Sequence, residues 1–246
     1  MKFVLATQNP KKLKEMSAIL GELGVEVVSE ADLGVKIEVE ETGDTFAENS
    51  LLKAKAVMEA TKLPAIADDS GLCVNALNGG PGVYSARFGG EGLDDTGRYR
   101  LLLQMMHGQA DRRAHFHTTI TCAFPNGDVL QDDGEVEGTI AFAPMGEGGF
   151  GYDPVFFVPE LRKTFGQLTA EEKASVSHRG KALRAFAAAL DVRCRCGRVL
   201  GRNFRLRCHL RRGHRRRRHG DRRHGRHFQH RVLIASVIHS LRTRQQ

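Results

Sequence analysis

The charge of this chain changes sign near residue 190, so its two segments have to be considered separately. Residues 1–190 contain 19 Lys and Arg against 27 Asp and Glu, a net charge of −8, whereas residues 191–246 contain 18 Arg, no Lys and two acidic residues, a net charge of +16. The segment 1–190 is long enough for one domain with a buried core. A segment dense in like charge is predicted to be disordered on its own.

Apolar runs and cysteine positions indicate the cellular location to expect for this protein. No apolar run approaches the roughly 18–20 residues that span a bilayer, and the longest run of the second segment, 232–238, is far too short. The first residues lead directly into a strand-like run, so we expect no signal peptide. Cys73 and Cys122 lie in apolar segments, which favours buried thiols over a disulfide. We therefore expect a cytoplasmic location and no membrane association.

The spacing of apolar residues in 1–190 predicts alternating strands and helices. Asn9 followed by Pro10 is typical of a helix start, and Thr45 and Glu48 have the spacing of a capping box. A Pro-Asn-Gly turn at 125–127 predicts a hairpin. The predicted strands are 3–6, 25–28, 64–67, 116–124, 129–142 and 154–158. The predicted helices are 10–23, 46–60, 94–107 and 178–190. This order predicts an α/β fold with a mixed sheet.

A first polar cluster joins the first predicted strand to the first predicted helix. It consists of Thr7, Gln8, Asn9, Pro10, Lys11 and Lys12. A helix N-terminus presents unpaired N–H groups and the positive end of the helix dipole, and Lys12 adds a full charge, so the cluster suits a phosphate group. A capped helix with a solvated lysine would give the same pattern.

A second cluster is the acidic pair Asp68 and Asp69, which we expect at the end of the predicted strand 64–67. Adjacent carboxylates beside a buried strand are destabilised by desolvation unless a cation or hydrogen-bond donors compensate them. Hard oxygen ligands of this kind suit Mg²⁺, which would also bridge the phosphates of a substrate, and Glu40 and Glu41 are candidates for a further ligand. An exposed turn capped by Asp and Ser is the alternative.

A third cluster combines a Gly-rich loop with charged residues further along the chain. Phe150 and Tyr152 lie between glycines and are candidates to stack on a nucleobase, with Asp153 hydrogen-bonding to its edge. Lys173 and Arg179 are candidates to bind phosphate or a base carbonyl. Loop packing of the aromatic residues and solvation of the charged ones are the structural alternatives.

Seven motifs occur in order along residues 1–190. They are Thr-x-Asn-x-x-Lys, Glu-Glu-Thr-Gly, Thr-Phe-x-Glu-Asn, Ala-Asp-Asp-Ser-Gly-Leu, Gly-x-Tyr-Ser-Ala-Arg, Gly-Gly-Phe-Gly-Tyr-Asp-Pro and Ser-His-Arg-Gly. Together they resemble the inosine/xanthosine triphosphate pyrophosphatase family, and the resemblance covers essentially all of this segment. It implies Mg²⁺-dependent hydrolysis of ITP, dITP and XTP to the nucleoside monophosphate and pyrophosphate, which cleanses the nucleotide pool.

The resemblance also implies an architecture and a set of residue roles. It implies a long central mixed β-sheet with flanking helices, two lobes around a nucleotide cleft, and a homodimer. Asp69 is similar to the catalytic residue that accepts a proton from the attacking water and contacts Mg²⁺, and Glu40 to a second metal ligand. The residues that resemble substrate-binding positions are Thr7, Gln8, Asn9, Pro10, Lys11, Lys12, Ser70, Phe150, Gly151, Tyr152, Asp153, Lys173, His178 and Arg179.

The chemistry of these side chains agrees with such roles. Cleavage between the α- and β-phosphates needs an in-line water, a base, and cations that neutralise the leaving pyrophosphate, for which Lys12 and Lys173 are candidates. Selection of hypoxanthine or xanthine over adenine needs donors to the 6-oxo group, which His178, Arg179 or a backbone N–H can supply. A related nucleotide pyrophosphatase with another base preference is the nearest alternative function.

Three interpretations of the segment 191–246 stay open. The run 215–219 could bind nucleic-acid phosphates non-specifically, with an affinity that falls steeply with salt, which would suit a nucleic-acid-binding protein. A zinc site is the second, with candidate ligands Cys194, Cys196, Cys208 and His209. Their spacing is not that of regular paired zinc motifs. The third is a frameshift product, because GC-rich DNA read out of frame yields many Arg and no Lys.

Overall fold

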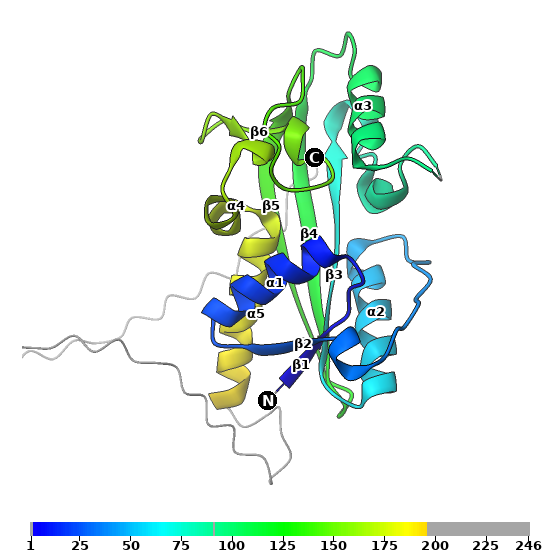
Figure 1. The fold of residues 1–246 in the computed structure, drawn as a ribbon, viewed down its shortest axis with the longest axis vertical. Coiled ribbons are helices and arrows are strands. Elements are labelled where there is room, and N and C mark those ends of the chain that lie inside the picture. The colour runs from blue at the N-terminus through cyan, green and yellow to red at the C-terminus, as the bar shows by residue number, and fades with distance from the viewer. Residues whose placement is uncertain (1, 91, 196–246) are drawn as a thin grey trace, which may run out of the picture. The chain divides into compact units, whose positions relative to one another are not determined.

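The computed structural model describes residues 2–90 and 92–195, which form a seven-stranded sheet with helices on both faces (Figure 1). The strands are β1 (Lys2–Leu5), β2 (Glu26–Ser29), β3 (Ala65–Val74), β4 (Arg113–Ala123), β5 (Val129–Ile140), β6 (Phe156–Val158) and β7 (Lys163–Thr164). The helices are α1 (Pro10–Glu22), α2 (Phe46–Thr61), α3 (Asp95–Met105), α4 (Ala170–Val176) and α5 (His178–Arg195). The predicted α/β fold is confirmed.

The sheet is mixed, in the order β2-β1-β3-β4-β5-β6-β7. β1 pairs in parallel with β2 and β3, and the remaining neighbours are antiparallel. The predicted hairpin is confirmed, since the Phe124 N–H donates to the Asp128 carbonyl (2.9 Å) across the turn between β4 and β5. Both predicted caps are also present: Asn9 caps α1, and Thr45 forms a capping box with Glu48 at the start of α2.

Two apolar clusters hold helices against opposite faces of the sheet. Alternate residues of β1 point in opposite directions, so Phe3 and Leu5 pack with α1 and α5 while Val4 packs with α2. Figure 1 shows α1 and α5 on one side of the long strands and α2 on the other. Gly134 in β5 permits a close approach of α5, because a Cβ there would clash with the backbone of His178 and Ala182. The start of α5 is therefore fixed close to the centre of the sheet.

A third apolar cluster surrounds the far half of β3, β4 and β5. Its buried residues are Leu72, Val74, Leu102, Met106, Ala114, Phe116, Val136, Ile140, Tyr152, Val155, Phe156, Val158, Phe165 and Leu168. They come from α3, β6 and the segment that precedes α4, as well as from the long strands. The long strands thus connect two separately packed regions, with β1 and β2 at one end and α3 and β6 at the other (Figure 1).

Several boundaries differ from the predicted ones. The last helix was predicted to end at residue 190, but α5 continues to Arg195, and the Arg193 guanidinium lies 5.9 Å from the centre of the Phe124 ring. Helix α4 and strand β7 were not predicted. Cys73 and Cys122 are free thiols, as expected, although Cys73 is only half-buried. Among the described residues, every helix is too short or too polar to cross a bilayer.

The three interpretations of 191–246 concern residues that lie outside the described part of the chain, except for 191–195 at the end of α5. They stay predictions.

Candidate functional site

The candidate site lies where β1 ends beside the middle of β3. β1 pairs with β3 only through Val4–Ala65 and Leu5–Ile66. Beyond this point the chain leaves the sheet as the loop 6–9 and enters α1, while β3 continues past it. Asn9 fixes the start of α1, because its side chain accepts hydrogen bonds from the N–H groups of Lys11 (2.9 Å) and Lys12 (3.3 Å). The N-terminus of a helix therefore lies next to the acidic segment of β3.

The prediction that Asp68 and Asp69 end a strand is wrong. Both lie in the middle of β3, paired with Ile120 and Thr119 of β4. Aspartate is unfavourable in strand interiors, which made the acidic pair resemble a turn. Tertiary structure outweighs that propensity, because β4 supplies the backbone partners and basic side chains compensate both charges. Because neighbouring residues of a strand point to opposite faces, the two carboxylates enter different surroundings.

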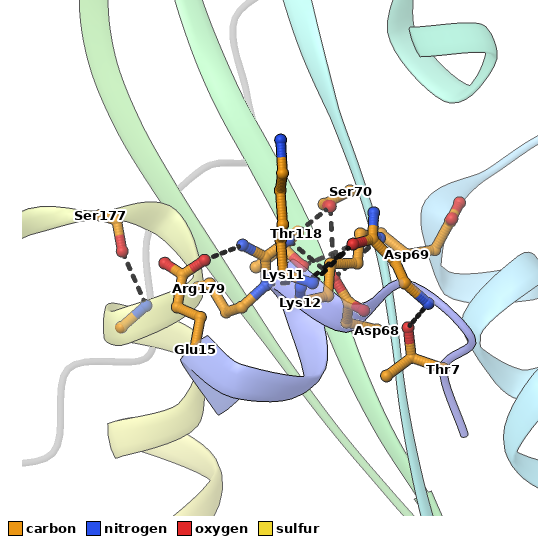
Figure 2. Close-up of polar contacts among 12 residues, drawn as sticks. Thr7, Lys11, Lys12, Glu15, Asp68, Asp69, Ser70, Thr118, Ser177 and Arg179 are labelled. Atoms are coloured by element: carbon orange, nitrogen blue, oxygen red, sulfur yellow. Dashed lines mark hydrogen bonds and ion pairs between the residues drawn. The ribbon is translucent and has the colours of Figure 1, made fainter. Parts of the chain in front are cut away.

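The α5-side cluster comprises Asp68, Lys12, Glu15, Ser70 and Arg179. Asp68 Oδ2 accepts hydrogen bonds from Arg179 Nε (3.2 Å) and Nη2 (2.9 Å), and Lys12 Nζ lies 3.1 Å away. Arg179 Nη1 donates to Glu15 Oε2 (2.9 Å), and its Nη2 also donates to Ser70 Oγ (2.9 Å). Figure 2 shows these side chains converging from α1, β3 and α5. The cluster joins three elements that are far apart in sequence.

The two central charges of the α5-side cluster are deeply buried, and all its charges are paired. Arg179 and Asp68 are each 1% exposed. Burial alone would raise the pKa of the Asp68 carboxyl, but the charges of Lys12 and Arg179 outweigh it and hold that pKa well below its usual value. Burial lowers the pKa of Lys12, which is surrounded by other cations as well as by Asp68. Asp68 is therefore a fixed anion that positions two cations.

The α2-side cluster comprises Asp69, Lys53 and Glu41. Lys53 Nζ lies between the two carboxylates, 3.0 Å from Asp69 Oδ1 and 2.7 Å from Glu41 Oε1. Asp69 Oδ2 is buried and has no hydrogen-bond partner among the described residues. Burial, aided by the charge of Glu41, raises the pKa of Asp69 despite the opposing charge of Lys53. Asp69 therefore binds a proton more readily than Asp68, and one of its oxygens is available.

A third group of contacts surrounds Lys173 and Phe150. Lys173 Nζ donates to Asp153 Oδ2 (2.7 Å), and the same oxygen accepts from the Phe150 N–H (2.7 Å). Lys173 Nζ also lies 4.6 Å from the centre of the Phe150 ring and 3.8 Å from Glu15 Oε2. Gly149 is needed here because it has a positive φ of 75° and a Cβ would clash with the Asp153 side chain. The Gly-rich loop is thereby held against α4.

Tyr152 and His178 form part of the wall beside this group. The Tyr152 ring is 4% exposed, and its hydroxyl donates to the Ser85 carbonyl (2.9 Å). The His178 ring stacks on Phe116 with centres 4.7 Å apart. Burial and the neighbouring charges of Arg179 and Lys173 lower the pKa of His178 well below 6.5. His178 is therefore neutral near pH 7, and its Nδ1 is buried without a hydrogen-bond partner in the described part of the chain.

Many of these side chains line two neighbouring cavities of about 360 and 340 Å³. Both are lined by Asn9, Lys12, Glu41 and Ala86. Other predicted site residues that line the first are Thr7 and Gln8. Those that line the second are Asp69, Ser70, Phe150, Gly151, Tyr152, Asp153, Lys173, His178 and Arg179. Three clusters that are distant in sequence thus line two neighbouring cavities.

Three predicted site residues do not line either cavity. Pro10 and Lys11 occupy the first turn of α1, and the Lys11 ammonium pairs with Asp95 at the surface (3.6 Å). Glu40 is exposed, whereas its neighbour Glu41 faces Lys53 and both cavities. Of the two glutamates, only Glu41 faces the cavities.

Sequence reasoning missed several charged residues of the site, among them Lys53 and Glu15. Lys53 follows the buried stripe of α2 that includes Asn49 and Ser50, so its helical spacing was a usable signal. Glu15 lies three residues after Lys12 and hence on the same face of α1. Their partners, Asp69 and Arg179, lie elsewhere in the sequence, so the pairings themselves had no local signal.

Comparison of the sequence with known proteins identifies its relatives. A model of the Ham1 family matches residues 3–189. A Thermus thermophilus protein named dITP/XTP pyrophosphatase is 52% identical over 190 residues, which cover 77% of this chain and 91% of that protein.

Comparison with solved structures finds relatives of the same kind. A Staphylococcus aureus Ham1 protein superposes with a TM-score of 0.71 at 41% identity, over 78% of this chain and 99% of that one. A Mycobacterium abscessus structure titled nucleoside-triphosphatase / dITP/XTP pyrophosphatase superposes with a TM-score of 0.62 at 45% identity, over 75% of this chain and 98% of that one. The chain therefore belongs to the Ham1 family.

Proposed function

We propose that this protein hydrolyses non-standard purine nucleoside triphosphates, namely ITP, dITP and XTP, to the nucleoside monophosphate and pyrophosphate. Membership of the Ham1 family and similarity to proteins named dITP/XTP pyrophosphatase support the activity. The main structural support is the position of Asp69. This buried carboxylate has one oxygen without a hydrogen-bond partner among the described residues, and it lines a cavity together with Lys12, Lys173 and Arg179. Such an arrangement combines a base with cations for phosphate groups.

Asp69 is proposed to accept the proton of the attacking water. The water oxygen forms a bond to the α-phosphorus, the bond from that phosphorus to the bridging oxygen breaks, and pyrophosphate leaves. A general base is most effective when its pKa approaches the working pH, and the raised pKa of Asp69 moves it in that direction. Asp68, whose pKa is lowered, is a poorer proton acceptor and is proposed to hold Lys12 and Arg179 in place.

The loop from Thr7 to Lys12 is proposed to bind the phosphates. Its residues end at the N-terminus of α1, where N–H groups and the helix dipole favour anions. Lys12 and Lys53 line the first cavity and add positive charge. The charge that develops on the leaving pyrophosphate would be neutralised by these groups.

The donor set at Asp69 fits Mg²⁺. Asp69 Oδ2 is buried without a partner among the described residues, which is costly unless a cation approaches it. Carboxylate oxygens are the ligands that Mg²⁺ prefers, and Glu41 or Glu40 would supply a second one. When bound there, the ion would neutralise phosphate charge and polarise the reacting phosphoryl group.

Recognition of the base is proposed to occur in the second cavity. Phe150 offers a ring for stacking, and the wall formed by His178 and Arg179 offers donors to a 6-oxo group. The 6-amino group of adenine would leave such donors unpaired, at a cost of about 1–3 kcal/mol for each one buried. Asp153 is proposed to position Lys173 and the Phe150 backbone, because one of its oxygens binds both.

The family resemblance also implies a homodimer in the cytoplasm, and we include both in the proposal. Sedimentation of the purified full-length protein at two concentrations tests the dimer, since a monomer at micromolar concentration would contradict it.

The activity is tested by pyrophosphate release from ITP, dITP, XTP, ATP, GTP and a pyrimidine triphosphate, with and without Mg²⁺. We expect Mg²⁺-dependent turnover of the first three and little of the others. Preference for a pyrimidine triphosphate would instead favour a related pyrophosphatase with another base preference. Absence of any turnover would contradict the proposal. A truncated comparison protein should retain residues through Arg195, since α5 extends that far.

A further inference from the structure

A second group of metal-ligating side chains lies on the half-exposed face of β4 and β5. Antiparallel pairing places His115 opposite Glu137 and His117 opposite Glu135. Residues two apart on a strand share a face, so two imidazoles on β4 face two carboxylates on β5. One ligand atom from each of His115, Glu135 and Glu137 lies within 4.8 Å of the other two.

The two histidines differ in what they already contact. His117 stacks on Phe46 of α2 with ring centres 5.2 Å apart, its Nε2 lies 3.3 Å from Asp133 Oδ1, and its Nδ1 lies 3.7 Å from Glu135. The His115 imidazole makes no hydrogen bond or ion pair to the described residues, and neither does the Glu137 carboxylate. Both imidazole nitrogens of His115 are therefore available to a ligand.

This group is separate from the candidate active site. Cys73, which pairs directly with His115, lies four residues along β3 from Asp69, or about 13 Å at roughly 3.3 Å per residue. None of the three residues lines the two cavities of that site. A cation held here would have its own ligands and would not be the proposed catalytic Mg²⁺.

The ligand types indicate which cation fits. Mg²⁺ prefers oxygen ligands and is poorly served by imidazole, whereas imidazole suits Zn²⁺ and other first-row transition ions. One imidazole with two carboxylates gives three protein ligands, which leaves a position for water or a fourth group. We propose that His115, Glu135 and Glu137 form a surface site for a divalent transition-metal ion such as Zn²⁺.

Charge on β5 gives this site a consequence for stability. Asp133, Glu135 and Glu137 form a row of like charges on one face of β5, and like charges repel one another. Burial, aided by the charge of Glu135, raises the pKa of the neighbouring Cys73 thiol to about 11. A bound divalent cation would neutralise this row and join β4 to β5, so Zn²⁺ should stabilise the folded protein.

The test is calorimetric titration of the full-length protein with ZnCl₂, together with thermal unfolding with and without the metal. His115→Ala and the double variant Glu135→Gln/Glu137→Gln are each expected to lose one equivalent of Zn²⁺ relative to wild type, or to bind it at least roughly tenfold more weakly. Each should also lose the increase in melting temperature that Zn²⁺ gives the wild-type protein. Binding of Zn²⁺ by the candidate ligands of 191–246 would be the same in all variants and would cancel in the comparison.

His107→Ala is the matched control, because His107 is an exposed histidine outside the group. It should keep both the stoichiometry and the Zn²⁺-dependent stabilisation. Unchanged binding in His115→Ala would overturn the proposal, as would an equal loss in the His107 control. A loss in His117→Ala without a loss in His115→Ala would overturn the assigned ligands. MgCl₂ at the same concentration should not reproduce the stabilisation, and if it does, the site is not selective for imidazole-binding ions.

Discussion

The two charged clusters on either side of β3 contain similar residues but differ in how their carboxylates are used. In the α5-side cluster, Asp68 is surrounded by Lys12 and Arg179, and its pKa is lowered. In the α2-side cluster, Asp69 shares Lys53 with a second carboxylate, Glu41, and its pKa is raised. The pKa values of these two adjacent residues are thus shifted in opposite directions, because a strand directs neighbouring side chains to opposite faces. Burial raises the pKa of both carboxyls, and the neighbouring charges decide that only the pKa of Asp69 stays raised.

Substitution of the proposed base should give the largest effect on activity. Asp69→Asn is expected to reduce kcat for ITP by about 10²–10⁴-fold, the usual contribution of a general base. Its folding should be little affected, because Lys53 keeps its ion pair with Glu41 (2.7 Å). Pyrophosphate release and thermal unfolding measure the two effects. Substantial residual hydrolysis of ITP would show that Asp69 is not the base.

Substitution of the neighbouring carboxylate, Asp68, should instead lower mainly the stability of the folded protein. Asp68→Asn leaves the buried Arg179 and the partly buried Lys12 short of an anion, and loss of one partner from a buried pair such as Asp68–Arg179 costs about 3–5 kcal/mol. Urea unfolding without substrate measures the loss. Glu59→Gln, an exposed change on α2, is the control and should alter stability by less than about 0.5 kcal/mol. Equal stability of Asp68→Asn and the control would remove the distinction between the two clusters.

Glu41 and Glu40 offer a sharper test of the α2-side cluster. The family resemblance favours Glu40 as the metal ligand, whereas the geometry places Glu41 beside Lys53 and Asp69. Glu41→Gln is expected to raise the Mg²⁺ concentration for half-maximal activity roughly tenfold, a typical loss for a residue that supports a metal site. Glu40→Gln should leave it unchanged. The reverse result would show that Glu40 turns inward when metal and substrate are bound.

The smallest expected effect is a pH dependence of stability that arises from His178. Its pKa in the folded protein lies well below the ordinary value of 6.5, so the unfolded state binds the proton first as the pH falls. This contribution to stability is present above about pH 6.5 and is lost as the pH falls towards the folded-state pKa. The melting temperature of the wild-type protein should therefore fall more steeply with acid than that of His178→Asn, by a few degrees at about 2–4 °C per kcal/mol. Parallel curves would contradict the burial of a neutral His178.

Local patterns in the sequence were sufficient for much of the fold. Asn9 and Pro10 started a helix as predicted, Thr45 and Glu48 formed a capping box, and the turn before Asp128 closed a hairpin. Each signal depends on residues within a few positions of one another, so it can be recognised without the tertiary structure. Helix α4 was missed although Thr169 and Glu172 also have capping-box spacing.

The acidic pair shows where local patterns fail. Asp68 and Asp69 have poor strand propensity, and the residues that compensate them lie on α1, α2 and α5. Nothing near them in the sequence shows that β4 will pair with them or that Lys53 and Arg179 will approach from opposite faces. The predicted end of a strand was therefore wrong, although each of the two residues lines one of the cavities.

By itself, the sequence determined the α/β class, most helix and strand positions, and the order of motifs that indicated the family. The tertiary structure alone decided which carboxylate is an anchored anion and which has an available oxygen and a raised pKa. It also decided that Glu41 rather than Glu40 faces the cavities, and that Lys53 and Glu15 belong to the site. Secondary structure follows from short-range spacing, whereas a pKa depends on burial and on charges brought together from distant segments, and those exist only in the folded chain.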